Sequence, residues 1–235
     1  MNTEPLKYFI EKYGIDVDSI KRIVYGKKYS ALMLNNGNIG VCSNLLRNVN
    51  VSKNELLNID INNLDHRIIA NAYFCALFNN DNIYNKKQDI YKTVDFSIYK
   101  DIVMIGLFRP LVKKFERDDV NIHIFDKMID SDKTVPMKFQ KDYLSKADCV
   151  ILSGTTVFNG SFQQIINNTN EKCDVFLLGP SCIMHQYLFK FKNLKVIFGS
   201  VFNKYDDEVL NIIEKDYGTK EFLPLGNKVE YYPEN

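Results

Sequence analysis

Four short apolar runs in the C-terminal half of the chain each end in a glycine and lead into a polar loop. They are Ile102–Gly106, Val150–Gly154, Val175–Gly179 and Val196–Gly199. Unbroken aliphatic and β-branched runs of this length are typical of strands buried on both faces of a parallel sheet. In such sheets ligands bind beyond the carboxyl ends of the strands, where a glycine lets the backbone approach a ligand closely. The runs therefore predict a parallel sheet and a binding site at one of its edges.

Composition narrows the class of protein. The chain has 235 residues, enough for one large or two small domains, and its 30 Lys and Arg against 29 Asp and Glu leave a formal net charge of +1. This balance argues against a nucleic-acid or membrane-surface protein, because both need a basic surface. No apolar run approaches the ~20 residues of a membrane helix, and the N-terminus does not resemble a secretory signal. With no export signal, we expect a cytoplasmic protein whose five cysteines are reduced thiols.

Residues 1–95 predict a small α+β domain. Apolar spacing indicates a helix over Glu4–Tyr13, and a longer helix over Leu64–Phe78 with one apolar face. Between them, Asn35-Asn36-Gly37 predicts a tight turn within a β-meander, and Ser52 with Glu55 predicts a capping box at a helix start. The expected strands are Ile20–Tyr25, Tyr29–Leu34 and Asn38–Ser43.

Residues 96–235 predict a Rossmann-like domain, with the boundary placed in or just after the polar stretch Asn79–Lys92. Strands alternate with helices there, which indicates an open, doubly wound parallel sheet. The expected strands are Ile102–Gly106, Asn121–Phe125, Cys149–Gly154, Asp174–Gly179 and Lys195–Val201. The expected helices begin near Pro110 and cover Phe162–Asn167 (with a capping box of Ser161 and Gln164), Met184–Phe191 and Glu208–Tyr217.

The first turn of this sheet carries Gly106, Phe108 and Arg109. A dinucleotide fingerprint needs three glycines, and only Gly106 is present. Asp126 nevertheless follows 126 − 106 = 20 positions later, where a ribose-binding acid stands in dinucleotide-binding folds. Arg109 at a helix start could pair with a carboxylate or phosphate. The alternative is that Asp126 caps a loop and Arg109 is a surface residue.

The third turn combines two glycines with hydroxyl and amide side chains. Such a turn can present several donors to one ligand, or its side chains can merely satisfy their own backbone. The candidate ligand-binding residues here are Gly154, Thr155, Thr156, Asn159 and Gly160.

The fourth turn carries Gly179, Pro180 and Ser181, followed by Cys182 and His185. The thiol and the imidazole are three residues apart, which would place them on one face of a helix start, and together they suit Zn²⁺ or a softer metal. Two ligands do not complete a site, so others would have to come from elsewhere in the fold. A buried thiol and a surface imidazole are the alternative. The residues that could complete a site are Cys42, Cys75 and His66.

At these turns the chain resembles the putative heavy-metal chelation domain family. The resembling segments are Val103–Val112, Ala147–Gly160 with its G-T-T-x-x-N-G pattern, Leu178–Ser181, Gly199–Ser200, and in the first half Gly26, Asn36–Gly37 and Ile39–Cys42. The resemblance implies an enolase-N-terminus-like domain followed by a Rossmann-like domain. It also implies a site in the cleft between them for a metal or a metal-chelating small molecule, with Gly199 and Ser200 in the last turn. Cys75 and the stretch from Cys182 to His185 depart from the family pattern and add soft donor atoms.

We therefore expect a protein that binds a small anionic or metal-bearing ligand, with a divalent or transition metal or a metal chelate as the cofactor. An enzyme that holds a nucleotide-like cofactor at the same edge, with Asp126 on a ribose, is the second hypothesis. A non-catalytic structural or regulatory module is the third. The expected partner is a small molecule or a metal, with no nucleic acid and no membrane, and assembly into a homo-oligomer is left open.

Overall fold

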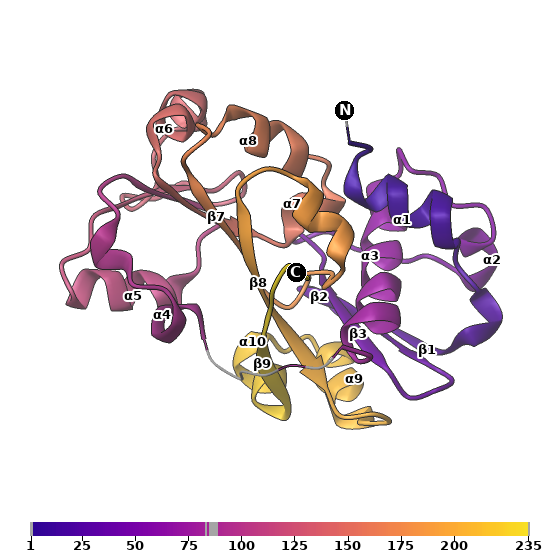
Figure 1. Ribbon diagram of the computed structural model, residues 1–235. Coiled ribbons are helices and arrows are strands. Elements are labelled where there is room, and N and C mark those ends of the chain that lie inside the picture. Colours follow the sequence, from indigo (N-terminus) through magenta and orange to yellow (C-terminus); the bar gives the residue numbers. More distant parts are fainter. Residues whose placement is uncertain (1, 83, 85–88, 235) are drawn as a thin grey trace.

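The computed structural model describes residues 2–82, 84 and 89–234, which form two β-sheets with helices packed around them (Figure 1). The smaller sheet is antiparallel, in the order β1-β2-β3, and the larger has the order β5-β4-β6-β7-β8-β9. The mixed α/β class that the sequence predicts is confirmed. The N-terminal elements are α1 (Pro5–Tyr13), η1 (Val17–Ser19), β1 (Ile20–Tyr25), β2 (Tyr29–Leu34), β3 (Ile39–Ser43), α2 (Lys53–Leu56) and α3 (Leu64–Asn79).

Local signals set the bounds of these elements. Gly37 has a φ of 85° in the turn between β2 and β3, a conformation that glycine adopts without strain. At α2, the Ser52 hydroxyl accepts a hydrogen bond from Glu55 N, and the Glu55 carboxylate accepts one from Ser52 N, so the predicted capping box is formed. Residues 83 and 85–88 of the polar stretch that suggested a domain boundary lie outside the described residues.

Helix α3 is buried on nearly all sides, whereas the sequence predicts a single apolar face. Eleven of its sixteen residues are buried, among them Asn71 and Asn79. One side packs on the small sheet so closely that a Cβ on Gly40 would lie 1.9 Å from Ala72 O. The other side contacts the C-terminal half of the chain, and Figure 1 shows α3 next to α7 (Thr155–Phe158) at that junction. A helix that is covered from two sides needs apolar residues all round.

The larger sheet confirms the five predicted strands and adds one. Strands β4 (Ile102–Ile105), β5 (Ile122–Phe125), β6 (Cys149–Ser153), β7 (Asp174–Leu178) and β8 (Leu194–Phe202) are mutually parallel. Strand β9 (Gly226–Tyr231) is antiparallel to β8 and was not predicted. Chain connections reverse direction between β4 and β6, so the crevice where open α/β sheets bind ligands lies at the carboxyl ends of these two strands.

Helices cover both faces of the larger sheet. On one face lie α4 (Ile90–Thr93), η2 (Phe96–Ile98) and α5 (Arg109–Arg117). On the other face lie α6 (Gln140–Lys146), α8 (Phe162–Asn168) and the N-terminal elements. The predicted helix over Met184–Phe191 is only a 3-10 turn, η4, and the predicted capping box at Ser161 does not form. The remaining elements are η3 (Met137–Phe139), η4 (Gln186–Lys190), α9 (Asp207–Glu214), α10 (Thr219–Phe222) and η5 (Leu223–Leu225).

The C-terminal helices α9 and α10 return to the small sheet and cover the face that α3 leaves free. Val209, Leu210, Ile213 and Phe222 form one apolar cluster there with side chains of β1, β2 and β3. Arg22 of β1 adds ion pairs across this contact with residues of α9. The small sheet is therefore a middle layer between α3 and α9. None of the helices in the described part of the chain is long and apolar enough to span a membrane.

Candidate functional site at the carboxyl edge of the larger sheet

The turns after β4, β6 and β7 meet at the crevice where the connections reverse. Gly106 has a φ of 95°, and a Cβ on it would lie 3.0 Å from Cβ of Ser153, the last residue of β6. Gly179, with a φ of 125°, follows β7, and a Cβ on it would lie 3.7 Å from Cε1 of Phe108. A Cβ on Gly106 would lie 3.8 Å from Cε2 of the same ring. Phe108 therefore lies between the first and fourth turns, which the sequence places 73 positions apart (179 − 106 = 73).

Arg109 begins α5 and is exposed to solvent at this edge. It forms no ion pair with any other described residue, although most arginines of the chain do: Arg22, Arg47, Arg67 and Arg117 all pair with carboxylates. The N-terminus of α5 also lacks a side-chain cap. A free guanidinium beside an uncapped helix start favours a negatively charged ligand.

The third turn largely satisfies itself. The Thr156 hydroxyl donates to Ser153 O at 2.7 Å, and Asn159 Oδ1 accepts hydrogen bonds from the backbone N–H and the hydroxyl of Ser161. Thr155 is half-buried, and its hydroxyl donates to Ser153 Oγ at 3.0 Å. Gly160, with a φ of 78°, faces Arg67 rather than the crevice. Of the two predicted threonines, Thr156 is buried and Thr155 is only half-buried. The Thr155 hydroxyl lies next to that of Ser153, a residue that was not predicted as part of the site.

The fourth turn is clamped against α3. Asn71 Nδ2 donates to Ser181 O at 3.0 Å, and Asn79 both donates to Cys182 O at 2.9 Å and accepts from Met184 N at 2.8 Å. Ser181 is buried, and its hydroxyl accepts a hydrogen bond from Ser43 N at 3.0 Å. The N-terminal elements thus hydrogen-bond to backbone groups of this turn, because α3 carries asparagine side chains on the side that contacts it.

Asp126 has a structural role in this arrangement. Its Oδ2 accepts a hydrogen bond from Leu107 N at 2.8 Å, and its Oδ1 accepts from Met128 N and Ile129 N. The carboxylate therefore joins the turn after β4 to the loop after β5. This agrees with the alternative interpretation of Asp126 as a loop cap, because its carboxylate accepts three hydrogen bonds from the backbone of these two loops.

Gly199 and Ser200 do not lie in a turn, so the prediction that they belong to the last turn of the sheet is wrong. Strand β8 continues to Phe202, and both residues pair with β9, Gly199 with Val229 and Ser200 with Lys228. A Cβ on Gly199 would lie 2.8 Å from the Met184 sulfur. The missing side chain of Gly199 therefore leaves room for the Met184 side chain against the strand. The apolar run is interrupted by a glycine for this reason, and not because the strand ends there.

The fold brings Cys42 and Cys75 to the junction that also holds Cys182. Asn71 Nδ2 lies 3.5 Å from Cys42 Sγ and 3.7 Å from Cys75 Sγ, and all three cysteines are buried. Burial raises the pKa of each of these thiols, and the proximity of Cys75 raises the pKa of Cys42 and Cys182 further. Burial therefore disfavours the thiolate form, which is the form that binds metals, in the metal-free protein.

His185 uses both ring nitrogens within the protein. Nδ1 accepts a hydrogen bond from Tyr187 N at 3.0 Å, and Nε2 lies 2.9 Å from the Tyr13 hydroxyl. His66 is at the far end of α3, where its Nδ1 accepts from Asp60 N. Across the described ranges, no three His, Cys, Asp or Glu side chains are grouped so that they could hold a metal ion. Metal binding by Cys182 and His185 therefore stays a prediction. Among the described residues, neither Cys42, Cys75 nor His66 completes a metal site with them.

One feature of the edge could not be found from the sequence. Leu45 and Leu46, just after β3, have φ values of 50° and 59°, a region that leucine rarely adopts. The loop joins the edge through the contact of Ser43 with Ser181, and Leu46 is 69% exposed. Backbone strain of this kind tends to occur at ligand sites. The two leucines are the central residues of a tight turn closed by a hydrogen bond from Arg47 N to Asn44 O at 3.0 Å, and nothing in the residue types signals their positive φ.

The fold is therefore that of a Rossmann-like α/β protein with a second, antiparallel sheet unit packed against it. Residues 89–231 match the model of the family described as putative heavy-metal chelation (DUF364), and the chain belongs to that family. No curated protein matches the chain.

Two solved structures of this family have the same fold. A protein of unknown function from Pyrococcus horikoshii superposes with a TM-score of 0.78 at 16% identity, covering 97% of this chain and 98% of that one. A protein of unknown function from Desulfitobacterium hafniense DCB-2 superposes with a TM-score of 0.74 at 17% identity, covering 97% of this chain and 96% of that one. Both the small antiparallel unit and the Rossmann-like unit are therefore common to relatives whose sequences have diverged widely.

Proposed function

We propose that this protein binds a small anionic ligand, including an anionic metal chelate, at the carboxyl ends of β4, β6 and β7. The observation that carries the proposal is the meeting of three turns, with Phe108 between Gly106 and Gly179, Ser153 against Gly106, and Arg109 beside them without an ion-pair partner among the described residues. The Ser43–Leu46 loop would close the site from the side of the small sheet. The residues assigned to the ligand are Gly106, Phe108, Arg109, Ser153, Thr155 and Gly179.

Charge and donors favour an anion over a cation. Arg109 supplies a positive charge, and the uncapped start of α5 adds partial positive charge. The nearby carboxylate, Asp126, is occupied by backbone N–H groups. Hydroxyls of Ser153 and Thr155 can rotate to donate to an oxygen of the ligand. Phe108 offers an apolar wall, as is usual in sites where a few polar groups orient a ligand.

A bare metal ion does not fit the donors at this edge. The cysteine side chains near it are buried, no three His, Cys, Asp or Glu side chains in the described ranges are grouped so that they could hold a metal ion, and both nitrogens of His185 have protein partners. A metal that reaches the site would therefore arrive as cargo within a chelating small molecule whose carboxylates or similar groups carry the negative charge. Recognition would be of the chelator's anionic groups, for which Arg109 and the hydroxyls are suited.

Calorimetric titration with citrate, ferric citrate and inorganic phosphate tests the proposal. Arg109→Ala should weaken binding of the best of these ligands about tenfold or more, because a hydrogen bond to a charged group contributes roughly 1.5–3 kcal/mol. The matched control is Arg117→Ala, since Arg117 ends the same helix and pairs with its neighbour Asp118.

Thr155→Ala should weaken binding by a smaller factor, as expected for a neutral hydrogen bond. Absence of saturable heat with all three anions would contradict an anion site. An equal loss in Arg109→Ala and Arg117→Ala would show that only general surface charge matters.

A further inference from the structure

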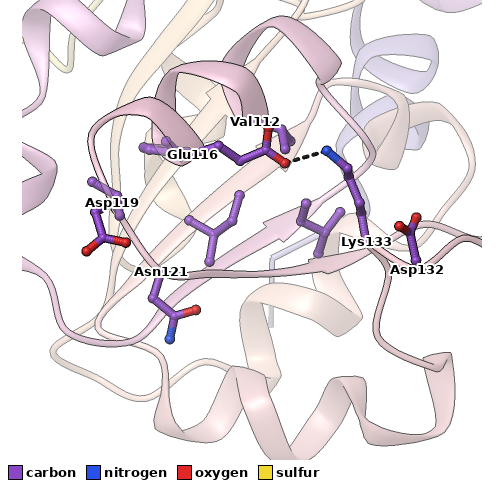
Figure 2. A pocket seen from close by; sticks show the side chains of 10 residues that line it. Val112, Glu116, Asp119, Asn121, Asp132 and Lys133 are labelled. Atoms are coloured by element: carbon purple, nitrogen blue, oxygen red, sulfur yellow. Dashed lines mark hydrogen bonds and ion pairs between the residues drawn. The ribbon is translucent and has the colours of Figure 1, made fainter.

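A groove of about 620 Å³ lies at the free edge of the larger sheet, away from the proposed anion site. Strand β5 and helix α5 form its floor, and residues 132–133 form its far wall (Figure 2). Apolar side chains make up the floor, namely Val112, Phe115, Ile122 and Ile124. The volume is within the range of sites that bind a small ligand or a few side chains of a partner.

Strand β5 is the outermost strand of the sheet, and its outer edge is only partly covered. Phe125 O accepts a hydrogen bond from Gly106 N, so Phe125 and His123 direct their backbone groups toward β4. Alternation along the strand then directs those of Ile122 and Ile124 outward. Ile124 is covered, because its carbonyl accepts from Val135 N at 2.7 Å. Ile122, which lines the groove, therefore directs its N–H and C=O outward, where no other described residue hydrogen-bonds to them.

The rim of the groove is acidic. Glu116 forms an ion pair with Lys133, which Figure 2 shows spanning the groove from α5 to the far wall. Asp119 and Asp132 are exposed and form no ion pair with any other residue in the described ranges. Figure 2 places Asp119 and Asp132 at opposite ends of the groove, which Ile122 and Ile124 of β5 also line. Two unneutralised carboxylates that flank an apolar floor favour a partner with an apolar centre and basic ends.

We propose that this edge is a docking site for an extended basic segment of another protein, which adds to the sheet beside Ile122. Strand addition supplies main-chain hydrogen bonds, and alternate side chains supply specificity. Side chains two apart lie on the same face of a strand, about 6.6 Å apart at ~3.3 Å per residue. One apolar side chain would enter the groove, and basic side chains two positions before and after it would meet Asp119 and Asp132. The recognised pattern is basic-x-apolar-x-basic.

Fluorescence polarisation with a labelled peptide, Thr-Lys-Thr-Leu-Thr-Lys-Thr, tests this docking site on the whole chain. We expect saturable binding that weakens as salt is raised, because the basic ends meet exposed carboxylates. Three altered peptides should bind at least tenfold more weakly: one with Glu for both Lys, one with Ser for Leu, and one with an N-methylated backbone at the centre. The last removes a backbone donor and leaves the side chains unchanged.

The protein variant is Asp119→Asn with Asp132→Asn, which should weaken peptide binding at least tenfold. Asp130→Asn is the matched control, because Asp130 is an exposed carboxylate of the same loop that does not line the groove. All these positions are exposed, and circular dichroism checks that the variants fold. No saturable binding to millimolar peptide, equal binding of the Glu peptide, or no effect of the double variant would overturn the proposal. Unchanged binding of the Ser and N-methyl peptides would reduce the groove to a cation site and overturn it as well.

Discussion

Arg67 offers a sharp test of how the two sheet units are held together. It lies on α3, and its guanidinium donates to Glu4 Oε1 at 2.6 Å, Ile61 O at 3.2 Å, Val157 O at 3.4 Å and Phe158 O. Val157 and Phe158 end α7, within the third turn, and neither is exposed. Glu4 also caps α1 by accepting from Lys7 N. One side chain thus joins α1, α3 and α7.

We expect Arg67→Met to lower the free energy of unfolding by about 3 kcal/mol. Removing one member of a buried, hydrogen-bonded ion pair costs roughly 3–5 kcal/mol. The lower end applies because the Arg67 side chain is 11% exposed and that of Glu4 is 21% exposed, so water can partly solvate the carboxylate that remains. The carbonyls of residues 157 and 158 would lose their donor inside the protein. A loss of ~3 kcal/mol is a large share of the 5–15 kcal/mol typical of a domain.

Urea unfolding gives this free energy, with an unchanged m-value as the check that the folded state is intact. Arg47→Met is the matched control, because Arg47 also pairs with a carboxylate at the start of α3, Asp65, but is 49% exposed. That variant should lose less than ~1 kcal/mol. A double-mutant cycle with Glu4→Gln isolates the ion pair from the carbonyl contacts. If Arg67→Met loses no more than Arg47→Met, the guanidinium does not hold the units together and the reasoning fails.

Two further changes test the packing of the N-terminal elements. Gly40→Ala should lower the free energy of unfolding by about 3 kcal/mol, because its Cβ would meet the Ala72 carbonyl oxygen, whereas Gly218→Ala, whose extended backbone accepts a side chain and whose Cβ would lie 3.6 Å from its nearest neighbour, should lose about 1 kcal/mol or less. Equal losses in urea unfolding would argue against the clash. Burial, with Lys12 and Lys190 nearby, lowers the pKa of His185, so the folded state resists protonation and stability should fall as pH drops below about 6.5. His185→Gln should lose less stability than the wild type between pH 7.5 and 5.5, and an equal loss would contradict the assignment.

The elements that the sequence predicts well are those whose signal is local. Strands β4 to β8 are short apolar runs with turn residues after them, and burial on both faces requires such runs wherever they occur. The β2–β3 turn with Gly37 and the capping box of Ser52 and Glu55 depend on residues at most three positions apart. Strand β9 was missed because, in an antiparallel strand at the sheet edge, only Val229 and Glu230 are buried.

For the candidate site too, local sequence signals could be used for prediction, whereas contacts between distant segments could not be foreseen. Residue types alone placed it at the carboxyl edge and selected Gly106, Phe108, Arg109, Thr155 and Gly179, all of which the structure brings to the crevice or its margin. They could not show that the backbone carbonyls of Ser181 and Cys182 would accept hydrogen bonds from Asn71 and Asn79 of α3, which lie more than a hundred positions away in the chain. Nor could they distinguish a ribose-binding Asp126 from a loop cap, because both need a carboxylate after a buried strand.

The sequence by itself determined a parallel sheet with helices and an antiparallel unit before it, and it predicted a candidate ligand edge marked by glycines, because periodicity and turn chemistry act over a few residues. Tertiary structure alone decided which polar groups at that edge remain free. It buried α3 on both sides, turned the fourth loop into a contact between the units, buried the cysteines and left Arg109 without an ion-pair partner among the described residues. Those outcomes depend on which segments pack together, and packing joins residues that no local pattern relates.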